Sequence, residues 1–505
     1  MSAGALVRRA TRGSTALCGG RARRLTPYQV FGLLFWLVMT LAYWRVPPCC
    51  EAGQHAAAVE RLLRAGHADT TASPYVLAQY ATARLTGLGG WQLLRVCGPL
   101  NLLVVLTGLG RLVRVLTPRP WAPVLALLFM SVLWGTRSAP DAGSVALLPL
   151  TGSLGYPSAF ALGLTLWAWA LTGTRARDPR RVRYVGPSGL RSLSGYAALG
   201  VLYGLVALVD PVLGVAAAAG AVAFVAGWQR GWRGAVWGRW GLMGAVAVGV
   251  IVCGAPARVL PGTDAAYGTH ADLAAQCWLA LLGLPALWLR TRVPPGQAPP
   301  AGRGAGPGAR RWTGARSGWR DPLVLLFAVE VLVAAPGVRH GSGELLGTAL
   351  LAPQCALAVE LAAERPWPVR RRALGWAAAA GVCLGFLTAQ AGAVVPRSLD
   401  PVGFVQPPRW PSYDWAARHI GPGEPVVTDD YFAERLLPGY GIEPADADDH
   451  RSPVRWLLLT RQERLPGDAV VVDWSRRTGE VLARLTRTGD LPVAAGPAAP
   501  PTTRR

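Results

Sequence analysis

The feature that most constrains this chain is a series of long apolar runs with almost no charge at their centres. Apolar runs of about 17–25 residues cross a bilayer as helices, because a helix satisfies its own backbone polar groups where water is absent. The runs lie at 28–44, 91–109, 121–135, 154–173, 195–209, 212–228, 241–254, 274–289, 322–338, 345–363 and 373–395. The sequence therefore predicts an all-α polytopic membrane protein with about eleven transmembrane helices, and it excludes a soluble multidomain enzyme.

The arginines set the expected orientation, because positively charged residues in short loops stay on the cytoplasmic side. Alternate connections carry arginines in groups, whereas the intervening short loops hold single ones such as Arg137. The groups lie at 8–24, 111–119, 175–183, 230–239, 290–320 and 365–372. The alternation keeps its phase along the chain. We therefore expect a multi-pass protein of the cell membrane with a cytoplasmic N-terminus and an extracytoplasmic C-terminal tail.

The positive net charge does not indicate a nucleic-acid partner. The chain has 51 basic and 28 acidic residues, but its arginines lie between the apolar runs and not on one compact face. Lysine is absent and Asn101 is the only asparagine, a skew that indicates the base composition of a high-GC bacterium. No spacing of cysteine and histidine matches a zinc site. We therefore expect membrane lipids as partners, no nucleic acid, no metal and no cofactor.

The polar segments predict the domain organisation. Residues 1–27 form a basic cytoplasmic N-terminus, and 28–395 form the transmembrane domain. Within it, 47–90 is a long first outer loop, and the Pro-, Gly- and Arg-rich loop 290–321 is predicted to be disordered. Residues 396–496 predict a small extracytoplasmic α/β domain, followed by a disordered tail at 497–505. In that domain we expect helices at 415–420, 433–437 and 479–485, and strands at 425–428, 454–459 and 469–472.

The first outer loop is patterned. One amphipathic helix is predicted at 54–65, and a second begins at Ser73-Pro74, where serine caps the helix and proline occupies its first turn. Both helices are expected to lie on the membrane surface. Glu51 precedes His55 by four residues, so the two share a helix face. A carboxylate at this boundary can act as a general base toward a hydroxyl group, although a solvated acidic residue explains the position equally simply.

The stretches 51–55, 58–66 and 73–75 resemble the first luminal loop of GT-C fold glycosyltransferases, which use polyprenyl-phosphate sugars. That family includes protein mannosyltransferases and aminoarabinose transferases. The resemblance implies a GT-C-like fold in which the acidic residue after the first span, here Glu51, is the catalytic base. The family usually has Asp at this position, often in an acidic pair, whereas this chain has Cys50 before Glu51.

Further residues on the predicted outer side are candidates for substrate binding. Tyr156 opens a span in a Tyr-Pro pair, which also occurs in bacterial members of that family, and Asp210-Pro211 interrupts an apolar run. Arginine binds phosphate well, so Arg258 or Arg339 could neutralise a lipid-linked phosphate. Each of these residues also has a simpler interpretation, as a turn former, a solvated residue or a lipid headgroup anchor. The complete set of candidates is His55, Asp141, Tyr156, Asp210, Arg258, His270, Arg339 and His340.

The sequence thus predicts an integral membrane glycosyltransferase of the cell envelope, which moves a sugar from a polyprenyl-phosphate donor to an extracytoplasmic acceptor whose identity stays open. Two alternatives remain. A transporter or lipid flippase would place ionisable residues within the spans, where Glu330 and Glu360 are the main candidates. A non-catalytic membrane scaffold would use the tail to bind a partner and would not need Glu51.

Overall fold

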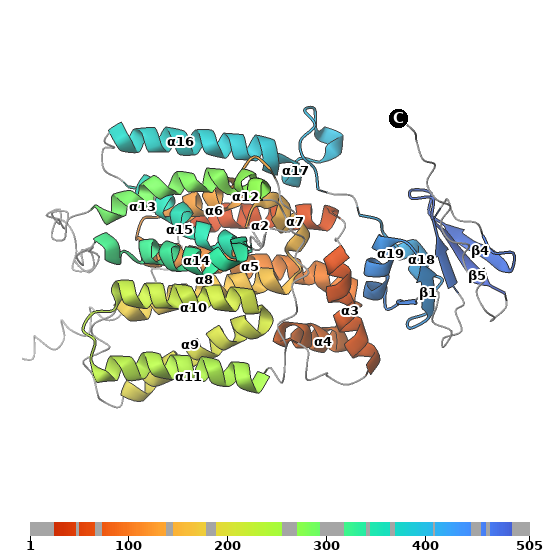
Figure 1. The fold of residues 1–505 in the computed structure, drawn as a ribbon, viewed down its shortest axis with the longest axis horizontal. Helices are drawn as coiled ribbons and strands as arrows, with labels where there is room; N and C mark the ends of the chain where they lie inside the picture. The colour runs from red at the N-terminus through yellow and green to blue at the C-terminus, as the bar shows by residue number, and fades with distance from the viewer. Residues whose placement is uncertain are drawn as a thin grey trace, which may run out of the picture.

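The computed structural model describes residues 25–46, 50–65, 73–137, 145–177, 188–254, 270–292, 318–339, 344–363, 369–407, 410–445, 456–460 and 465–486. In these residues, apolar helices form a bundle, and a small sheet with short helices forms a C-terminal domain at one end of it (Figure 1). Helix α3 lies between the bundle and this domain.

The bundle is built from helices that run along its long axis (Figure 1). Its first half contains α2 (Pro27–Arg45), α5 (Gly90–Leu116), α6 (Ala122–Val132), α7 (Leu147–Ser153), α8 (Pro157–Arg177), α9 (Ser188–Val209), α10 (Pro211–Trp228) and α11 (Gly234–Gly254). Its second half contains α12 (His270–Cys277), the 3-10 helix η2 (Trp278–Gly283), α13 (Leu284–Thr291), α14 (Pro322–Arg339), α15 (Glu344–Leu361), α16 (Val369–Gly385), the π-helix η5 (Phe386–Gln390) and α17 (Ala391–Val394).

Five helices in the described residues are long and apolar enough to cross a membrane, and a sixth span arises if the bent pair α7 and α8 counts as one. Each of the eleven predicted runs coincides with a helix or a series of helices. By helix length and apolar composition, fewer than the predicted eleven spans are found in the described residues, because several runs form short or interrupted helices. The run at 274–289, for example, is divided among α12, η2 and α13. The chain is a multi-pass membrane protein.

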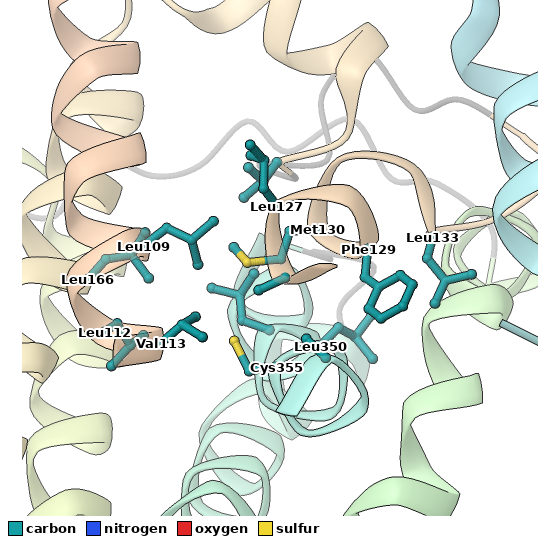
Figure 2. Packing of buried hydrophobic residues seen from close by; sticks show 14 of the residues in the cluster. Leu109, Leu112, Val113, Leu127, Phe129, Met130, Leu133, Leu166, Leu350 and Cys355 are labelled. Carbon is teal, nitrogen blue, oxygen red and sulfur yellow. The ribbon is translucent and has the colours of Figure 1, made fainter. Parts of the chain in front are cut away.

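Side chains from α5, α6, α8 and α15 meet at the centre of the bundle (Figure 2). Met130 of α6 lies there with Leu109 of α5 and Cys355 of α15, and all three are buried. Helices α5 and α8 approach closely at Gly108 and Gly163. A Cβ on Gly108 would lie only 2.8 Å from the carbonyl oxygen of Gly163, so a larger residue would not fit there. Small residues of this kind permit close helix packing in a bilayer, where no hydrophobic force acts between helices.

A buried ion network joins helices near the ends of the predicted loop 290–321. Arg290 of α13 lies 2.7 Å from Asp321 and 3.3 Å from Glu360, which in turn lies 3.0 Å from Arg371. Arg290 and Asp321 are almost fully buried, so the ends of this loop are ordered and the prediction of disorder was too wide. Residues 293–317 lie outside the described residues.

Segment 47–90, predicted as the first outer loop, contains both predicted helices. Helix α3 (Cys50–Ala65) begins four residues earlier than predicted, and α4 spans Pro74–Thr86. The Ser73 side chain accepts a hydrogen bond from the Val76 amide, so it caps α4 as expected. Gly87 ends α4 in the left-handed conformation, with φ of 71°, which glycine adopts without strain. Local sequence therefore determines where α4 begins and ends.

The C-terminal domain contains a five-stranded mixed sheet in the order β2-β1-β3-β5-β4. Strand β1 pairs in parallel with β2 and β3, whereas β5 pairs antiparallel with β3 and β4. The short helix η6 (Arg397–Leu399) lies in the connection from the bundle. The elements of the domain are α18 (Asp414–Ala417), β1 (Pro425–Thr428), α19 (Tyr431–Leu436), η7 (Leu437–Tyr440), β2 (Glu443–Ala445), β3 (Trp456–Leu459), β4 (Ala469–Trp474) and β5 (Val481–Leu485). The predicted α/β character is correct for this domain.

The predicted closing helix at 479–485 is wrong, because this segment is strand β5 in the interior of the sheet. A tight turn leads from β4 into it. Gly479 adopts a φ of 79°. The main-chain amide of Ser475 donates a hydrogen bond to the carbonyl oxygen of Glu480 at 2.8 Å. Leu482 and Ala483 are fully buried on opposite faces of the sheet. A short apolar segment that is buried on both faces lacks the alternation typical of strands, so its pattern did not distinguish strand from helix.

Candidate functional site

The structure describes part of the predicted site. Position 51 lies in the first turn of α3, and positions 270 and 339 lie at the ends of α12 and α14, but the side chains of Glu51, His270 and Arg339 are outside the described residues. Asp141, Arg258 and His340 are also outside them. Their roles, and their convergence on one site, stay predictions. His55, Tyr156 and Asp210 are described in full.

Helix α3 is held against the bundle by small residues. Ala52 and Ala56 are buried in a cluster with Leu94 of α5 and Tyr156. His55, on the same helix, contacts Tyr156 with a ring-centroid distance of 4.8 Å and an interplanar angle of 53°. The structure therefore brings together His55 and Tyr156, two residues that the sequence nominated independently. Helix periodicity places position 51 one turn before His55, on the same face of α3.

Burial makes the His55 imidazole neutral. Desolvation lowers the pKa of His55 from 6.5 to about 4, because removal from water disfavours the charged form. At neutral pH the ring can therefore donate one hydrogen bond and accept another, but it carries no charge that would attract a phosphate. A neutral imidazole of this kind can orient a hydroxyl group through a hydrogen bond.

Tyr156 lies at a break in the bundle. Helices α7 and α8 meet at Leu154, Gly155 and Tyr156 and form an angle of 117°. Such a break releases carbonyl oxygens from the helical hydrogen-bond pattern. In a membrane protein these oxygens must find other partners, because an unpaired buried carbonyl costs free energy.

Asn101 and Tyr75 supply those partners. The amide nitrogen of Asn101 lies 2.8 Å from the carbonyl oxygen of Leu154 and 3.3 Å from that of Tyr156. It also lies 2.8 Å from the Tyr75 hydroxyl, which donates to the carbonyl oxygen of Gly155 at 3.1 Å. Burial raises the pKa of the Tyr75 hydroxyl, so it keeps its proton. Residues from α4 and α5 thus stabilise the break beside His55.

Sequence reasoning missed Asn101 and Tyr75 as parts of this site. Asn101 is the only asparagine and lies within an apolar run. A polar side chain in such a run is costly unless it is paired, and it therefore marks a structural or functional position. That signal was available, but only the fold identified the three consecutive residues that Asn101 and Tyr75 contact.

Asp210 has a clear structural role. Its carboxylate accepts a hydrogen bond from the Leu213 amide at 3.0 Å, so it caps α10 directly before Pro211. This is the turn-forming function that its sequence context favours. A further role in substrate binding stays a prediction.

The two intramembrane carboxylates differ in their surroundings. Glu360 belongs to the ion network with Arg290 and Arg371, which explains its burial. Glu330 of α14 is fully buried and accepts a hydrogen bond from the Thr348 hydroxyl at 3.1 Å, while its second oxygen has no partner. Among the described residues, Glu330 is therefore the intramembrane carboxylate that the transport alternative would require.

The fold of this chain is similar to several solved structures, at low sequence identity. No protein-family model and no curated protein matches it. ArnT from Cupriavidus metallidurans, bound to undecaprenyl phosphate, is 15% identical over 93% of this chain and 98% of its own, with a TM-score of 0.46. The Archaeoglobus fulgidus oligosaccharyltransferase tethered with an acceptor peptide is 11% identical over 86% of this chain and 69% of its own, with a TM-score of 0.47. The archaeal oligosaccharyltransferase AglB from the same organism, in complex with an inhibitory peptide and a dolichol-phosphate, is 10% identical over the same shares, with a TM-score of 0.45.

Proposed function

We propose that this protein is an integral membrane glycosyltransferase that moves a sugar from a polyprenyl-phosphate donor to an acceptor hydroxyl on the extracytoplasmic side. The observation that supports the proposal most strongly is the packing of α3 against the bundle. This helix begins at Cys50, directly after the first span, and is held against the α7–α8 break through the His55–Tyr156 contact. Position 51, which carries a carboxylate, lies in the first turn of this helix, at one end of the bundle.

In the proposed reaction, Glu51 removes the proton from the acceptor hydroxyl. The acceptor oxygen attacks the anomeric carbon of the sugar as the bond from that carbon to the phosphate oxygen breaks. The phosphate keeps the bonding electrons and remains on the lipid. Arg258 or Arg339 neutralises the negative charge that accumulates there, which is where electrostatic stabilisation is most effective. His55 and Tyr156 contact the sugar or the acceptor, and Asp141, Asp210, His270 and His340 are further candidates for substrate contacts.

The proposed topology follows from the distribution of charge. Groups of arginines precede α2 and lie at or directly after the ends of α5, α8, α10 and α13 in the sequence. Arg177, the last residue of α8, stacks on Trp228 at 3.8 Å, and Arg292, directly after α13, stacks on Trp288 at 3.5 Å. Tryptophans are enriched at membrane–water interfaces, and short arginine-rich loops stay on the cytoplasmic side. The C-terminal domain and α3 are therefore assigned to the extracytoplasmic side, where the acceptor is expected.

The test compares wild type with Glu51→Gln in membranes supplied with radiolabelled polyprenyl-phosphate sugars. Because general-base catalysis contributes about 10²–10⁴-fold, we expect Glu51→Gln to lower the transfer rate at least a hundredfold. Glu434→Gln, on an exposed residue of the C-terminal domain, is the matched control and should transfer at the wild-type rate. Equal rates for wild type and Glu51→Gln would remove Glu51 from the mechanism.

The transport alternative depends on Glu330, and the same membranes distinguish it. A transferase that uses Glu51 should retain sugar transfer when Glu330 is changed to Gln, because this residue lies within the bundle and not at the proposed site. If Glu330→Gln abolished transbilayer movement of a labelled lipid while Glu51→Gln had no effect on any readout, the transporter would be the better assignment.

A further inference from the structure

The C-terminal domain contacts the helix that begins with Cys50 and Glu51. Near the start of α3, a Cβ on Gly53 would overlap the carbonyl oxygen of Arg435 and would lie 3.0 Å from the Cα of Leu436. No side chain larger than hydrogen fits between α3 and the α19 segment at this point. The close approach involves main chain on the domain side, so a flexible side chain cannot move away to relieve it.

The far end of α3 is held by charged groups. Arg64 lies 2.6 Å from Glu443 of β2, a contact between residues 379 positions apart in the sequence. One turn earlier, Glu60 accepts a hydrogen bond from the main-chain amide of Gly90 at 2.6 Å. Gly90 begins α5, so α3 is tied both to the bundle and to the C-terminal domain.

Trp91 of α5 extends from the bundle into the hydrophobic core of the C-terminal domain. Its ring packs in the cluster that contains Tyr413, Leu436 and Leu437 of the C-terminal domain. It lies 5.4 Å from the ring of Tyr440, and a Cβ at Gly439 would lie 2.7 Å from it. A bundle residue therefore forms part of the hydrophobic core of the domain. The two parts share a core and do not merely touch at their surfaces.

We propose that the C-terminal domain is a positioning element for Glu51, acting through Gly53, Trp91 and the Arg64–Glu443 pair. Helix α3 is clamped on one side by Leu94 and Tyr156 of the bundle and on another by the α19–η7 segment. A base acts efficiently only when it is held at the acceptor oxygen, and a displacement of about 1 Å can cost about 10²-fold in rate. The proposal rests on the proposed function. It assigns the domain a part in turnover and predicts that binding of the lipid donor does not require it.

The test uses two glycine-to-alanine variants that push the domain away from opposite sides of the contact. Gly53→Ala acts from α3 and Gly439→Ala acts from the domain. Gly238→Ala in α11 and Gly467→Ala in the domain are matched controls, because a Cβ at either position meets nothing within 4 Å. Docking is followed in the full-length protein by trypsin cleavage at Arg397, in the connection between the bundle and the domain.

We expect both contact variants to be cleaved faster than wild type and to transfer sugar at least tenfold more slowly at saturating donor. Their affinity for undecaprenyl phosphate, measured without a sugar, should stay within twofold of wild type, which loss of folding in the bundle would not permit. Both controls should behave like wild type. Wild-type turnover in an undocked variant would overturn the proposal, and so would full protection of both variants from cleavage.

These outcomes are separable from failure of the proposed function. If Glu51→Gln is inactive while the undocked variants turn over normally, Glu51 keeps its role and only the positioning role of the domain is lost. If Glu51→Gln is fully active, Glu51 is not the base and this inference fails, whereas the proposed sugar transfer fails only if the wild-type protein transfers no sugar.

Discussion

Replacement of Asn101 by leucine should loosen the α7–α8 break without disturbing the rest of the bundle. Leucine branches at the same carbon as asparagine, although it is larger, and it donates no hydrogen bond. The change removes the donors that reach the Leu154 carbonyl and the Tyr75 hydroxyl, both at 2.8 Å. The Tyr75 hydroxyl keeps its own bond to Gly155, so the break loses part of its support.

The expected cost follows from the number of partners. Hydrogen bonds between helices in membrane proteins contribute about 0.6 kcal/mol on average and about 1.7 kcal/mol at most. Two short bonds are lost, so Asn101→Leu should lower the free energy of unfolding by about 1–3 kcal/mol. Tyr75→Phe removes a partner of Asn101, so the double variant should lose less than the sum of the single changes, with a coupling of about 1 kcal/mol.

The measurement is reversible unfolding of the full-length protein in mixed micelles with increasing sodium dodecyl sulfate. Thr165→Val is the control, because the buried Thr165 hydroxyl bonds only to the Ala161 carbonyl of its own helix at 2.9 Å. This variant should change stability by less than about 0.5 kcal/mol, as substitutions without a special mechanism do. If Asn101→Leu were as stable as wild type, or if its effect simply added to that of Tyr75→Phe, the argument that this pair supports the break would be refuted.

Two further changes test other parts of the structure. Arg290→Met should lower stability by about 3–5 kcal/mol, because it leaves the Asp321 carboxylate buried without its partner; adding Asp321→Asn should recover part of this loss in the same unfolding assay, and full stability of Arg290→Met would contradict the buried pair. His55 binds fewer protons in the folded state, since its pKa falls from 6.5 to about 4. Stability should therefore decrease as pH falls from 6.5 to 4, by roughly 3 kcal/mol in total, and His55→Gln should abolish that slope; an unchanged slope would show that His55 is not its source.

Local patterns predicted much of the fold. The apolar runs coincide with the helices of the bundle because the requirement to hide backbone polar groups acts within each helix. Helix α4 begins and ends where Ser73, Pro74 and Gly87 indicate, since capping joins residues only three or four positions apart. Strand β1 matches its predicted bounds at Pro425–Thr428. His55 and Tyr156 were nominated as two separate candidates, and the structure brings their rings into contact, while their role in substrate binding stays a prediction.

Only the tertiary structure decided which distant residues meet. Strand β5 is a strand because β3 and β4 pair with it, and its own residues do not show this. Asn101 stabilises residues 53 and 55 positions away, and Arg64 pairs with Glu443 across 379 positions. The spacing of residues in the sequence predicts contacts within one helical turn or between neighbouring strands. Contacts between separate elements depend on how buried faces pack, and these determine where the break, the neutral histidine and the clamped helix lie.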